Sequence, residues 1–372
     1  MGDPLTDGQI LRVGVVGAGQ ISGAYLRTFP RLANLRVTAI ADLDAARAAA
    51  AADEIPGARA AAPEELYFAA DVDLVLNLTI PAAHAEVAHA AIAAGKHVYG
   101  EKPLAATTSE ARALLDAAGV AGVRVGCAPD TVLGTGIQTA RAVLDSGEIG
   151  APVAATAFMV TPGHERWHPA PEFYYRPGGG PLLDMGPYYL TALVTLLGPV
   201  RRVVGMSSTP RSTRIIGSGP RAGTEFKVDV ATHVTGVLEH EDGALSTLLM
   251  SFEVWAGALP RIEVYGTGGS LSVPDPNGFD GEVRLFPAES KEWQVVPARG
   301  GYPNASRGYG VADLARALAD DVPHRADGRL AYHVLDVMES LLAAARSGES
   351  VAVASTCDRP APVPADARPE EH

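Results

Sequence analysis

The chain has 372 residues, 47% of them hydrophobic, and a chain of this length is expected to form two domains that each bury a core. Its 43 acidic and 30 basic residues give a formal net charge of -13, which disfavours nucleic acid as a partner because phosphates would be repelled. Its two cysteines predict no disulfide framework and a reducing compartment. Because the sequence has neither a basic and apolar leader nor an apolar run of membrane length, we expect a soluble cytoplasmic protein.

Short apolar runs alternate with alanine-rich amphipathic stretches in the first third of the chain. Helical patterns include residues 44–53 and 83–94, the second ending at Gly95, where a left-handed cap is expected. Strands alternating with helices predict parallel βαβ units and a doubly wound sheet within residues 1–128. The predicted strands are residues 11–16, 35–41, 73–78, 97–99 and 123–126.

The first predicted strand ends in a glycine-rich loop that matches the dinucleotide fingerprint G-x-G-x-x-G/A, except that Ser22 holds the third small position. The first glycine makes the tight turn and the second lets the backbone approach a pyrophosphate. Asp42 ends the second strand, no arginine adjoins it, and a carboxylate there accepts from a ribose 2′-hydroxyl but repels a 2′-phosphate. We therefore predict NAD rather than NADP; the alternative is a glycine turn without nucleotide. The predicted contacts are Gly17, Gly19, Gln20, Ile21 and Asp42.

Longer β-rich runs follow a predicted helix at residues 135–146. Strands are expected at 154–160, 226–239 and 244–254, and the last two are joined by the hairpin turn His240-Glu241-Asp242-Gly243. These runs predict a mostly antiparallel sheet in a second domain, residues 129–310. Helical periodicity returns over 311–346 and predicts C-terminal helices in a region 311–350, packing near the domain interface. The proline- and alanine-rich residues 354–372 predict a disordered tail.

After the fifth predicted strand, Gly100-Glu101-Lys102-Pro103 resembles the E-K-P signature of the glucose-fructose oxidoreductase, inositol dehydrogenase and MocA family. The resemblance continues through residues 79–84, 178–186 and 265–270 and covers most of the chain. It implies a Rossmann domain followed by an α+β domain with a large open sheet. It also implies that Lys102 approaches both nicotinamide and substrate, where its ammonium would stabilise a developing alkoxide; a surface lysine is the alternative. Further cofactor contacts are expected at Thr79, Pro81, His84 and Glu101.

Members of this family pair the lysine with an aspartate and, four residues later, a histidine. Asp184 fits the first position, but Tyr188 stands where the histidine is usual, and residues four apart share a helix face. We therefore predict Lys102, Asp184 and Tyr188 as the catalytic residues. Tyr188 would carry the proton, because a nearby ammonium favours the phenolate; otherwise Lys102 alone or a histidine of residues 164–168 would do so.

His164-Glu165-Arg166-Trp167-His168 spells H-E-x-x-H, a zinc-binding pattern that requires both histidines on one helix. Prolines at 162, 169 and 171 argue against such a helix, so we expect no metal site. We expect instead a loop that faces the substrate, because aromatic rings stack on sugars and imidazoles bond their hydroxyls; structurally bonded histidines are the alternative. Asp130 is expected either at the substrate or at a helix N-cap. The candidate substrate residues are Asp130, His164, Arg166, Trp167, His168, Tyr174 and Tyr175.

These features predict NAD(H)-dependent hydride transfer to or from a secondary hydroxyl of a sugar, polyol or glycoside. One alternative is a redox-assisted lyase, epimerase or glycosidase that regenerates NAD within each turnover. Another is a non-catalytic NAD- or sugar-sensing regulator, against which the E-K-P motif and Asp184 argue. The resemblance also implies a homodimer or homotetramer formed through the second-domain sheet.

Overall fold

The computed structural model describes residues 10–369, which divide into two compact units. Unit 1 contains the residues up to Thr135, then 300–332 and the residues from Pro360 onward; unit 2 contains 136–299 and 333–359. The two C-terminal helices were expected in one region. The structure assigns α8 (Tyr309–Ala319) to unit 1, whereas α9 (Gly328–Ser347) begins in unit 1 and continues in unit 2.

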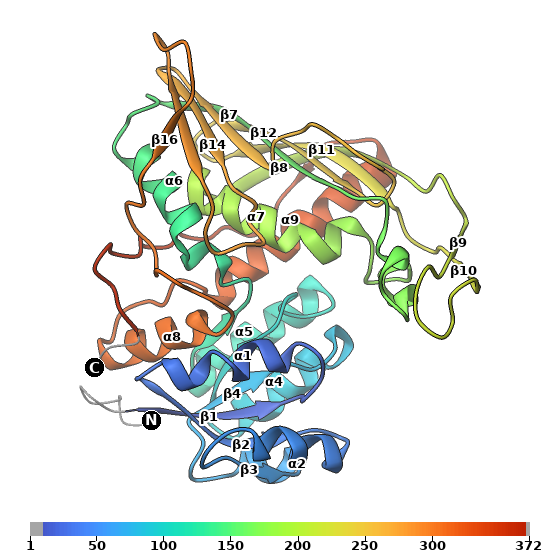
Figure 1. The fold of residues 1–372 in the computed structure, drawn as a ribbon, viewed down its shortest axis with the longest axis vertical. Helices are drawn as coiled ribbons and strands as arrows, with labels where there is room; N and C mark the ends of the chain where they lie inside the picture. Colours follow the sequence, from blue (N-terminus) through green and yellow to red (C-terminus); the bar gives the residue numbers. More distant parts are fainter. Residues whose placement is uncertain (1–9, 370–372) are drawn as a thin grey trace. The chain divides into compact units, whose positions relative to one another are not determined.

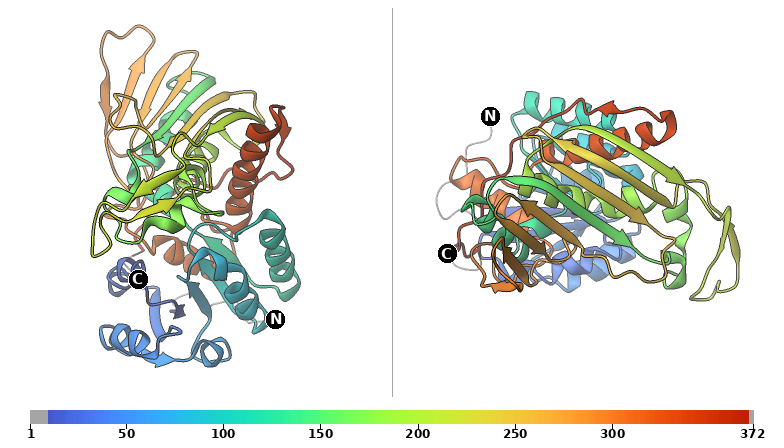
Figure 2. Two further views of the ribbon diagram at one scale, coloured as in Figure 1. Left: turned by 90° about the vertical axis from the view of Figure 1, so that its right-hand side faces the viewer. Right: turned by 90° about the horizontal axis from the view of Figure 1, so that it is seen from above.

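Unit 1 is built on a six-stranded, all-parallel sheet in the order β3-β2-β1-β4-β5-β6, with helices on both faces (Figures 1 and 2). The strand interiors are buried apolar residues, as expected for a sheet covered on both sides. The strands are β1 Leu11–Val16, β2 Leu35–Ala41, β3 Arg59–Ala61, β4 Leu74–Asn77, β5 His97–Gly100 and β6 Val125–Cys127. The other helices are α1 Ser22–Leu26, α2 Ala45–Asp53, α3 Pro63–Tyr67, α4 His84–Ala93 and α5 Thr108–Ala121, with 3-10 turns η1 Phe29–Arg31, η2 Pro81–Ala83 and η3 Thr131–Leu133.

Local sequence signals explain where several of these helices begin and end. Asp44 caps α2 by accepting from the N–H groups of Ala46 and Arg47. Thr107 and Glu110 form a capping box at the start of α5. Gly95, predicted as a left-handed cap after α4, has φ +73°.

The C-terminal segment corrects the prediction of disorder for residues 354–372. Up to residue 369 this segment is placed in an irregular but hydrogen-bonded path, and Val363 is 3% exposed. Gly301 N–H donates to Val363 O, and the Arg325 guanidinium donates to Pro362 O. Residues 370–372 lie outside the described part. The prediction failed because composition does not show that carbonyls of a proline-rich segment are bound by an arginine elsewhere in unit 1.

Unit 2 is built on a nine-stranded sheet in the order β16-β15-β14-β13-β7-β12-β11-β8-β17. All its pairs are antiparallel except β7 with β12, and the helices α6, α7 and α9 lie on one face (Figures 1 and 2). The single run expected at 226–239 is two strands, β10 and β11. The elements are α6 Thr135–Asp145, β7 Pro152–Val160, η4 His164–Arg166, η5 Pro171–Tyr175, α7 Pro181–Leu197, β8 Val200–Ser208, β9 Thr213–Ile215, β10 Glu225–Lys227, β11 His233–His240, β12 Leu245–Ser251, β13 Ile262–Gly266, β14 Gly269–Val273, β15 Val283–Pro287, β16 Gln294–Val296 and β17 Val351–Ala352.

Helix α7 follows a glycine-rich turn and packs closely on α9. It starts with Pro181 at its first position, where the missing N–H costs nothing, and Gly180 before it has φ +92°. A Cβ on Gly186 would lie 2.9 Å from the sulfur of Met338 on α9, so a larger residue there would force the Met338 side chain to shift. Asp184 therefore sits in the first turn of a firmly packed helix.

No helix within residues 10–369 is long and apolar enough to cross a membrane.

Candidate active site

The loops that follow β1, β2, β4 and β5 lie side by side at the carboxyl edge of the parallel sheet. Backbone hydrogen bonds connect them: Gly17 N–H donates to Ala41 O over 2.8 Å, and Glu101 N–H donates to Asn77 O over 3.0 Å. From the neighbouring strands β1 and β4 the chain winds outward in opposite directions. Such a switch point is where open parallel sheets bind ligands.

The first of these loops has the backbone that a close diphosphate requires. Gly17 has φ +101°, and a Cβ there would lie 2.7 Å from the carbonyl group of Leu78. A Cβ on Gly19, by contrast, would meet no described atom within 4 Å, and Gly19 and Gln20 are exposed. Ile21 precedes α1 and caps it with no side-chain hydrogen bond. The loop is thus closed on its sheet side and open on the other, with backbone N–H groups available to an anion, and it fits a dinucleotide pyrophosphate.

Asp42 lies at the end of β2, as predicted, but it has an arginine neighbour that the sequence analysis missed. One carboxylate oxygen accepts from Ala18 N–H at 2.8 Å and the other from Asp44 N–H at 2.9 Å. The Arg47 guanidinium, one turn into α2, lies 3.5 Å from the second oxygen and is about half exposed. The statement that no arginine adjoins Asp42 is therefore wrong: helix geometry, not chain adjacency, brings Arg47 back to it. Asp42 both fixes the glycine loop and faces a guanidinium.

The loop after β4 is held by Asn77. The N–H and hydroxyl of Thr79 both donate to Asn77 Oδ1, and Asn77 Nδ2 donates to the carbonyl of His84. His84 is 2% exposed, with Pro103 O 2.6 Å from its Nδ1 and Thr79 O 3.1 Å from its Nε2. Burial lowers the pKa of His84 and favours the neutral ring. His84 therefore joins two loops of this edge, while the predicted contacts of Thr79, Pro81 and His84 with a cofactor stay predictions.

Lys102 lies two residues after the end of β5, and Glu101 between them holds the backbone in front of it. The Glu101 carboxylate is 8% exposed; it accepts from the Tyr25 hydroxyl at 2.8 Å and from Lys102 N–H at 3.1 Å. The half-buried Lys102 side chain starts at the same sheet edge as the glycine loop. Glu101 is thus engaged by the protein itself, and its predicted contact with a cofactor stays a prediction.

Asp130 does not face a substrate; it caps a helix. The side chain is fully buried, and Oδ2 accepts from Gly308 N–H at 2.9 Å and from Gly310 N–H at 3.0 Å at the start of α8. Burial raises the pKa of Asp130, and Arg307 and the two N–H groups oppose that effect. The predicted contact with a substrate is therefore wrong. The alternative, a helix N-cap, holds, but the helix that Asp130 caps is α8, which lies about 180 residues later in the chain.

In unit 2 the structure brings together two residues that were predicted for separate roles. His164 Nε2 and Asp184 Oδ2 are 3.0 Å apart, and the two side chains are 12% and 16% exposed. His164 lies in the turn η4 after β7, and Asp184 lies in the first turn of α7. Tyr188, one turn further along α7, is 5% exposed. A half-buried imidazole–carboxylate pair of this kind can accept and return a proton.

Aromatic side chains surround this pair. The His164 ring lies 4.7 Å from the Tyr174 ring and 5.3 Å from Trp167, measured between centroids. Trp167 and Phe173 are 57% and 55% exposed, and His168 contacts both rings. The Arg166 guanidinium lies 4.5 Å from the centre of the exposed Trp255 ring. Exposed rings beside polar groups suit the C–H faces and hydroxyls of a sugar.

Tyr175 was predicted to touch the substrate, but it is completely buried and structural. Its hydroxyl donates to Glu165 and accepts from His164 N–H at 3.2 Å. Burial, followed by the hydrogen bond to Glu165, raises the pKa of Tyr175, so the phenol keeps its proton. Consecutive aromatic residues gave no sign of which ring would point inward.

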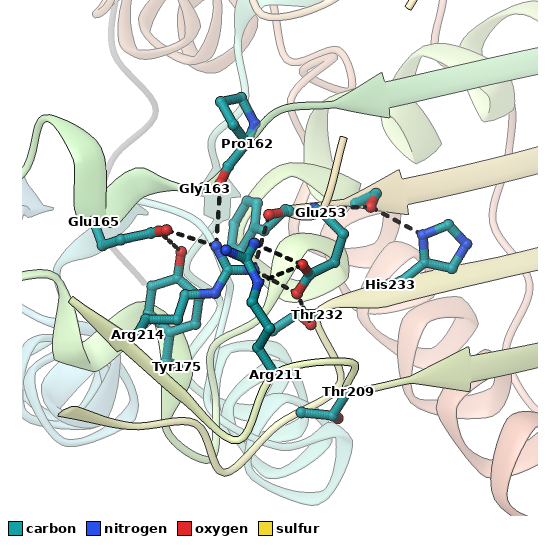
Figure 3. Close-up of polar contacts among 12 residues, drawn as sticks. Pro162, Gly163, Glu165, Tyr175, Thr209, Arg211, Arg214, Thr232, His233 and Glu253 are labelled. Atoms are coloured by element: carbon teal, nitrogen blue, oxygen red, sulfur yellow. Dashed lines mark hydrogen bonds and ion pairs between the residues drawn. The ribbon is translucent and has the colours of Figure 1, made fainter. Parts of the chain in front are cut away.

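Beneath the His164 turn lies a buried ionic network that sequence analysis did not predict (Figure 3). The Arg214 side chain, 1% exposed on β9, donates to Glu165 over 2.6 Å and to Pro162 O over 3.1 Å, and it pairs with Glu253. Arg211 and Thr232 also donate to Glu253; these bonds and the Arg214 charge outweigh burial and lower the Glu253 pKa. The charges come from three separate segments, which no local pattern connects.

The H-E-R-W-H segment is not the two-histidine helix of a zinc site. Residues His164–Arg166 form a single 3-10 turn that ends at Trp167 with φ -124°, as the flanking prolines predicted. His164 instead contacts Asp184, and the ring of His168 faces Phe173 and Tyr174. Across residues 10–369 no cluster of three or more histidine, cysteine, aspartate or glutamate side chains is placed to hold a metal ion.

Family models match most of the chain. Residues 11–128 match the model described as an oxidoreductase family with an NAD-binding Rossmann fold, and residues 137–272 match the GFO/IDH/MocA C-terminal domain.

Similar proteins and structures cover nearly the whole chain. A 1,5-anhydro-D-fructose reductase of Ensifer adhaerens is 32% identical over 83% of this chain and 94% of its own length. A D-xylose 1-dehydrogenase (NADP(+)) of Haloferax volcanii is 27% identical over 91% of this chain and 98% of its own. The crystal structure of an NAD binding oxidoreductase from Klebsiella pneumoniae shares the fold with a TM-score of 0.80, covering 93% of this chain and 99% of that one at 24% identity.

Proposed function

Because this chain belongs to the GFO/IDH/MocA family of oxidoreductases, we propose that it transfers hydride between a nicotinamide dinucleotide and a secondary hydroxyl of a sugar or polyol. The observation that carries this proposal is the carboxyl edge of the parallel sheet. There a loop that is sterically closed behind Gly17 and open over Gly19 lies beside Asp42 and the start of Lys102.

The roles of the residues follow from their chemistry. The backbone of residues 17–21 would bind the pyrophosphate, and Asp42 would accept from ribose hydroxyls. When bound, the nicotinamide ring accepts or supplies the hydride. Lys102 would orient the substrate hydroxyl and stabilise negative charge on its oxygen. Asp184 would orient a neighbouring side chain that takes or gives the hydroxyl proton.

NAD is the proposed cofactor form. Asp42 places a carboxylate where the adenosine ribose of a dinucleotide is read, and a 2′-phosphate would be repelled there. The Arg47 guanidinium moderates that repulsion, because it lies 3.5 Å from the same carboxylate. The preference of this chain for NAD over NADP therefore depends on the balance between the charges of Asp42 and Arg47. The family also contains a relative named as an NADP(+) enzyme.

A sugar or polyol substrate is supported by the surface around His164 and Asp184. Trp167 and Phe173 offer exposed ring faces, and the neighbouring imidazoles and Arg166 offer hydrogen-bond groups. The relative named as a 1,5-anhydro-D-fructose reductase acts on a substrate of this class.

The proposal is tested by measuring initial rates of NADH formation over a panel of sugars, polyols and anhydrosugars, each with NAD and with NADP. We expect turnover with at least one member and faster turnover with NAD. In the same assay Lys102→Ala should lose turnover while still binding NADH, and Lys102→Arg should recover part of the turnover. Binding of NADH without turnover on any member, in either direction, would contradict the proposal.

We further infer that the chain assembles as a homodimer or homotetramer through the open face of the nine-stranded sheet. Val204 on β8 lies opposite Val237 on β11, and Met206 and Leu245 point to the same face; all four are exposed apolar residues. Sedimentation equilibrium should show an oligomer that Val237→Lys dissociates. A monomeric wild-type chain would refute this assembly.

A further inference from the structure

The pair His164–Asp184 carries an inference that rests on the proposed function and deepens it. We infer that His164 is the acid–base residue of the reaction, and that Asp184 orients its ring. Tyr188 stands on α7 where a histidine is usual in the family. His164, in the turn after β7, would take the role of that histidine.

The geometry defines which ring nitrogen does the work. An ionised carboxylate can only accept hydrogen bonds, so the 3.0 Å contact with Asp184 requires Nε2 of His164 to carry a proton. The first turn of the long helix α7 favours the negative charge on Asp184, because backbone dipoles point their positive ends there. In the neutral ring, Nδ1 then carries the lone pair. Within residues 10–369 the hydrogen bond of the His164 ring is the one from Nε2 to Asp184, so we assign the exchange of a proton with the substrate to Nδ1.

The surroundings hold the ring in this orientation. Phe252, fully buried, lies 4.4 Å from the His164 ring, and Tyr174 meets it edge-on at 4.7 Å. The His164 backbone N–H donates to the Tyr175 hydroxyl, and Glu165 beside it is bound by Arg214. Figure 3 shows Arg214 between the two carboxylates that it binds. Arg214 is thus a positioning residue: it fixes the backbone on which His164 stands without touching the reacting atoms.

The chemistry favours an imidazole over the phenol of Tyr188. A free imidazole titrates near pKa ~6.5 and a free phenol near ~10, and a general base works best when its pKa lies close to the working pH. In the oxidation, a bound oxidised nicotinamide would accept the hydrogen of the substrate C–H with its two electrons, as hydride. The hydroxyl O–H gives its proton to Nδ1 of His164, and the products are a carbonyl compound, reduced nicotinamide and an imidazolium. The reduction runs the same steps backwards.

The kinetic test compares His164→Gln with Tyr188→Phe on a substrate from the panel. We expect His164→Gln to lower kcat by roughly 10²- to 10⁴-fold with NADH affinity unchanged, and Tyr188→Phe to lower it much less. Free imidazole should restore part of the turnover of His164→Gly. His233→Gln, which replaces a half-buried histidine bonded to Ser251 in the same unit, is the matched control and should keep the wild-type kcat. Full turnover in His164→Gln, or a loss confined to Tyr188→Phe, overturns the inference.

A second measurement needs neither substrate nor cofactor. In two-bond ¹H–¹⁵N spectra of the full chain, the His164 ring should show the Nε2–H tautomer at neutral pH, and Asp184→Asn should abolish the preference. An Nδ1–H tautomer in the wild type overturns the inference even if turnover is normal. A chain that oxidises a sugar but fails these tests retains the proposed function and loses only the assignment of His164. A chain with the Nε2–H tautomer but no turnover on any substrate contradicts the proposed function instead.

Discussion

Asp42 illustrates at the scale of one residue how a single carboxylate serves two purposes. Its bonds to the Ala18 and Asp44 N–H groups shape the glycine-rich loop, and under the proposed NAD preference its charge would repel a 2′-phosphate. Arg47 lies within 3.5 Å and is held by that charge. Removing the carboxylate therefore does more than relax a repulsion, because it releases a guanidinium that binds phosphate well.

We expect Asp42→Asn to shift the cofactor preference toward NADP, since an amide oxygen still accepts from Ala18 N–H while the negative charge is lost. The ratio of kcat/KM for NAD to that for NADP should fall by roughly 10- to 100-fold, the equivalent of a few kcal/mol of selective binding. The double variant Asp42→Asn with Arg47→Ala should show a smaller gain for NADP. An unchanged ratio in Asp42→Asn would remove Asp42 from cofactor selection.

At the scale of elements, the loop from Pro162 to Gly180 forms the candidate substrate surface of unit 2. Its loop character was predictable from the prolines around H-E-R-W-H, and η4 confirms it. The pairing of His164 with Asp184 was not predictable, because it joins residues 20 apart whose meeting depends on how α7 packs. The Arg214 network was hidden for the same reason, since a buried arginine on the short strand β9 looks like any surface arginine in sequence.

Gly163 is the point where this loop and the network meet, so Gly163→Ala should lower turnover. Its φ is +112°, and a Cβ would lie 2.2 Å from Glu165 Oε2 and 2.3 Å from Arg214 Nη1. We expect kcat to fall by roughly 10²-fold as His164 shifts, while the chain stays folded. Gly178→Ala is the matched control: it shares a positive φ of +89°, but its Cβ would meet no described atom within 4 Å. Equal kcat losses in both variants would show that backbone strain alone lowers kcat, and would contradict a role for the contacts of Gly163 with Glu165 and Arg214.

For the whole molecule, the parallel sheet of unit 1 and the change to a large, mostly antiparallel sheet followed from alternating patterns in the sequence, whereas the short strand β3 was not predicted. The division between units did not follow from them, because residues 300–332 and those from Pro360 return to the first unit. Strands such as β13 to β16 also escaped prediction, because short, half-exposed strands carry little periodicity. Long-range packing also buries several histidines that look ordinary in the sequence.

These buried histidines predict that the fold loses stability in mild acid. Burial and then the charge of Arg124 lower the pKa of His97 from 6.5 to about 4, and burial lowers those of His84, His240 and His333. Between about pH 6.5 and 4 the unfolded chain binds more protons than the folded chain, so the free energy of unfolding falls as the pH falls. His97 alone would contribute at most ~3 kcal/mol.

The measurement is urea unfolding at several pH values in this window, followed by circular dichroism. His97→Asn keeps an acceptor for the Arg124 N–H, which donates to Nδ1 at 2.9 Å in the wild type, but it cannot titrate. Its free energy of unfolding should therefore depend less steeply on pH. Paired carboxylates such as Asp73, whose pKa is lowered, act only at more acidic pH and do not confuse the comparison. A wild-type stability that is flat from pH 7 to 4.5 would refute the prediction.

The central claim, hydride transfer between a substrate carbinol and a nicotinamide, is tested most directly by following the transferred hydrogen. A panel substrate carrying deuterium on its reacting carbinol carbon is incubated with the chain and NAD, and the reduced cofactor is analysed by mass spectrometry and proton NMR. We expect one deuterium on the nicotinamide ring in each reduced molecule, and none when Lys102→Ala replaces the wild type. Reduced cofactor without deuterium, or a carbonyl product formed with no reduced cofactor, would contradict it.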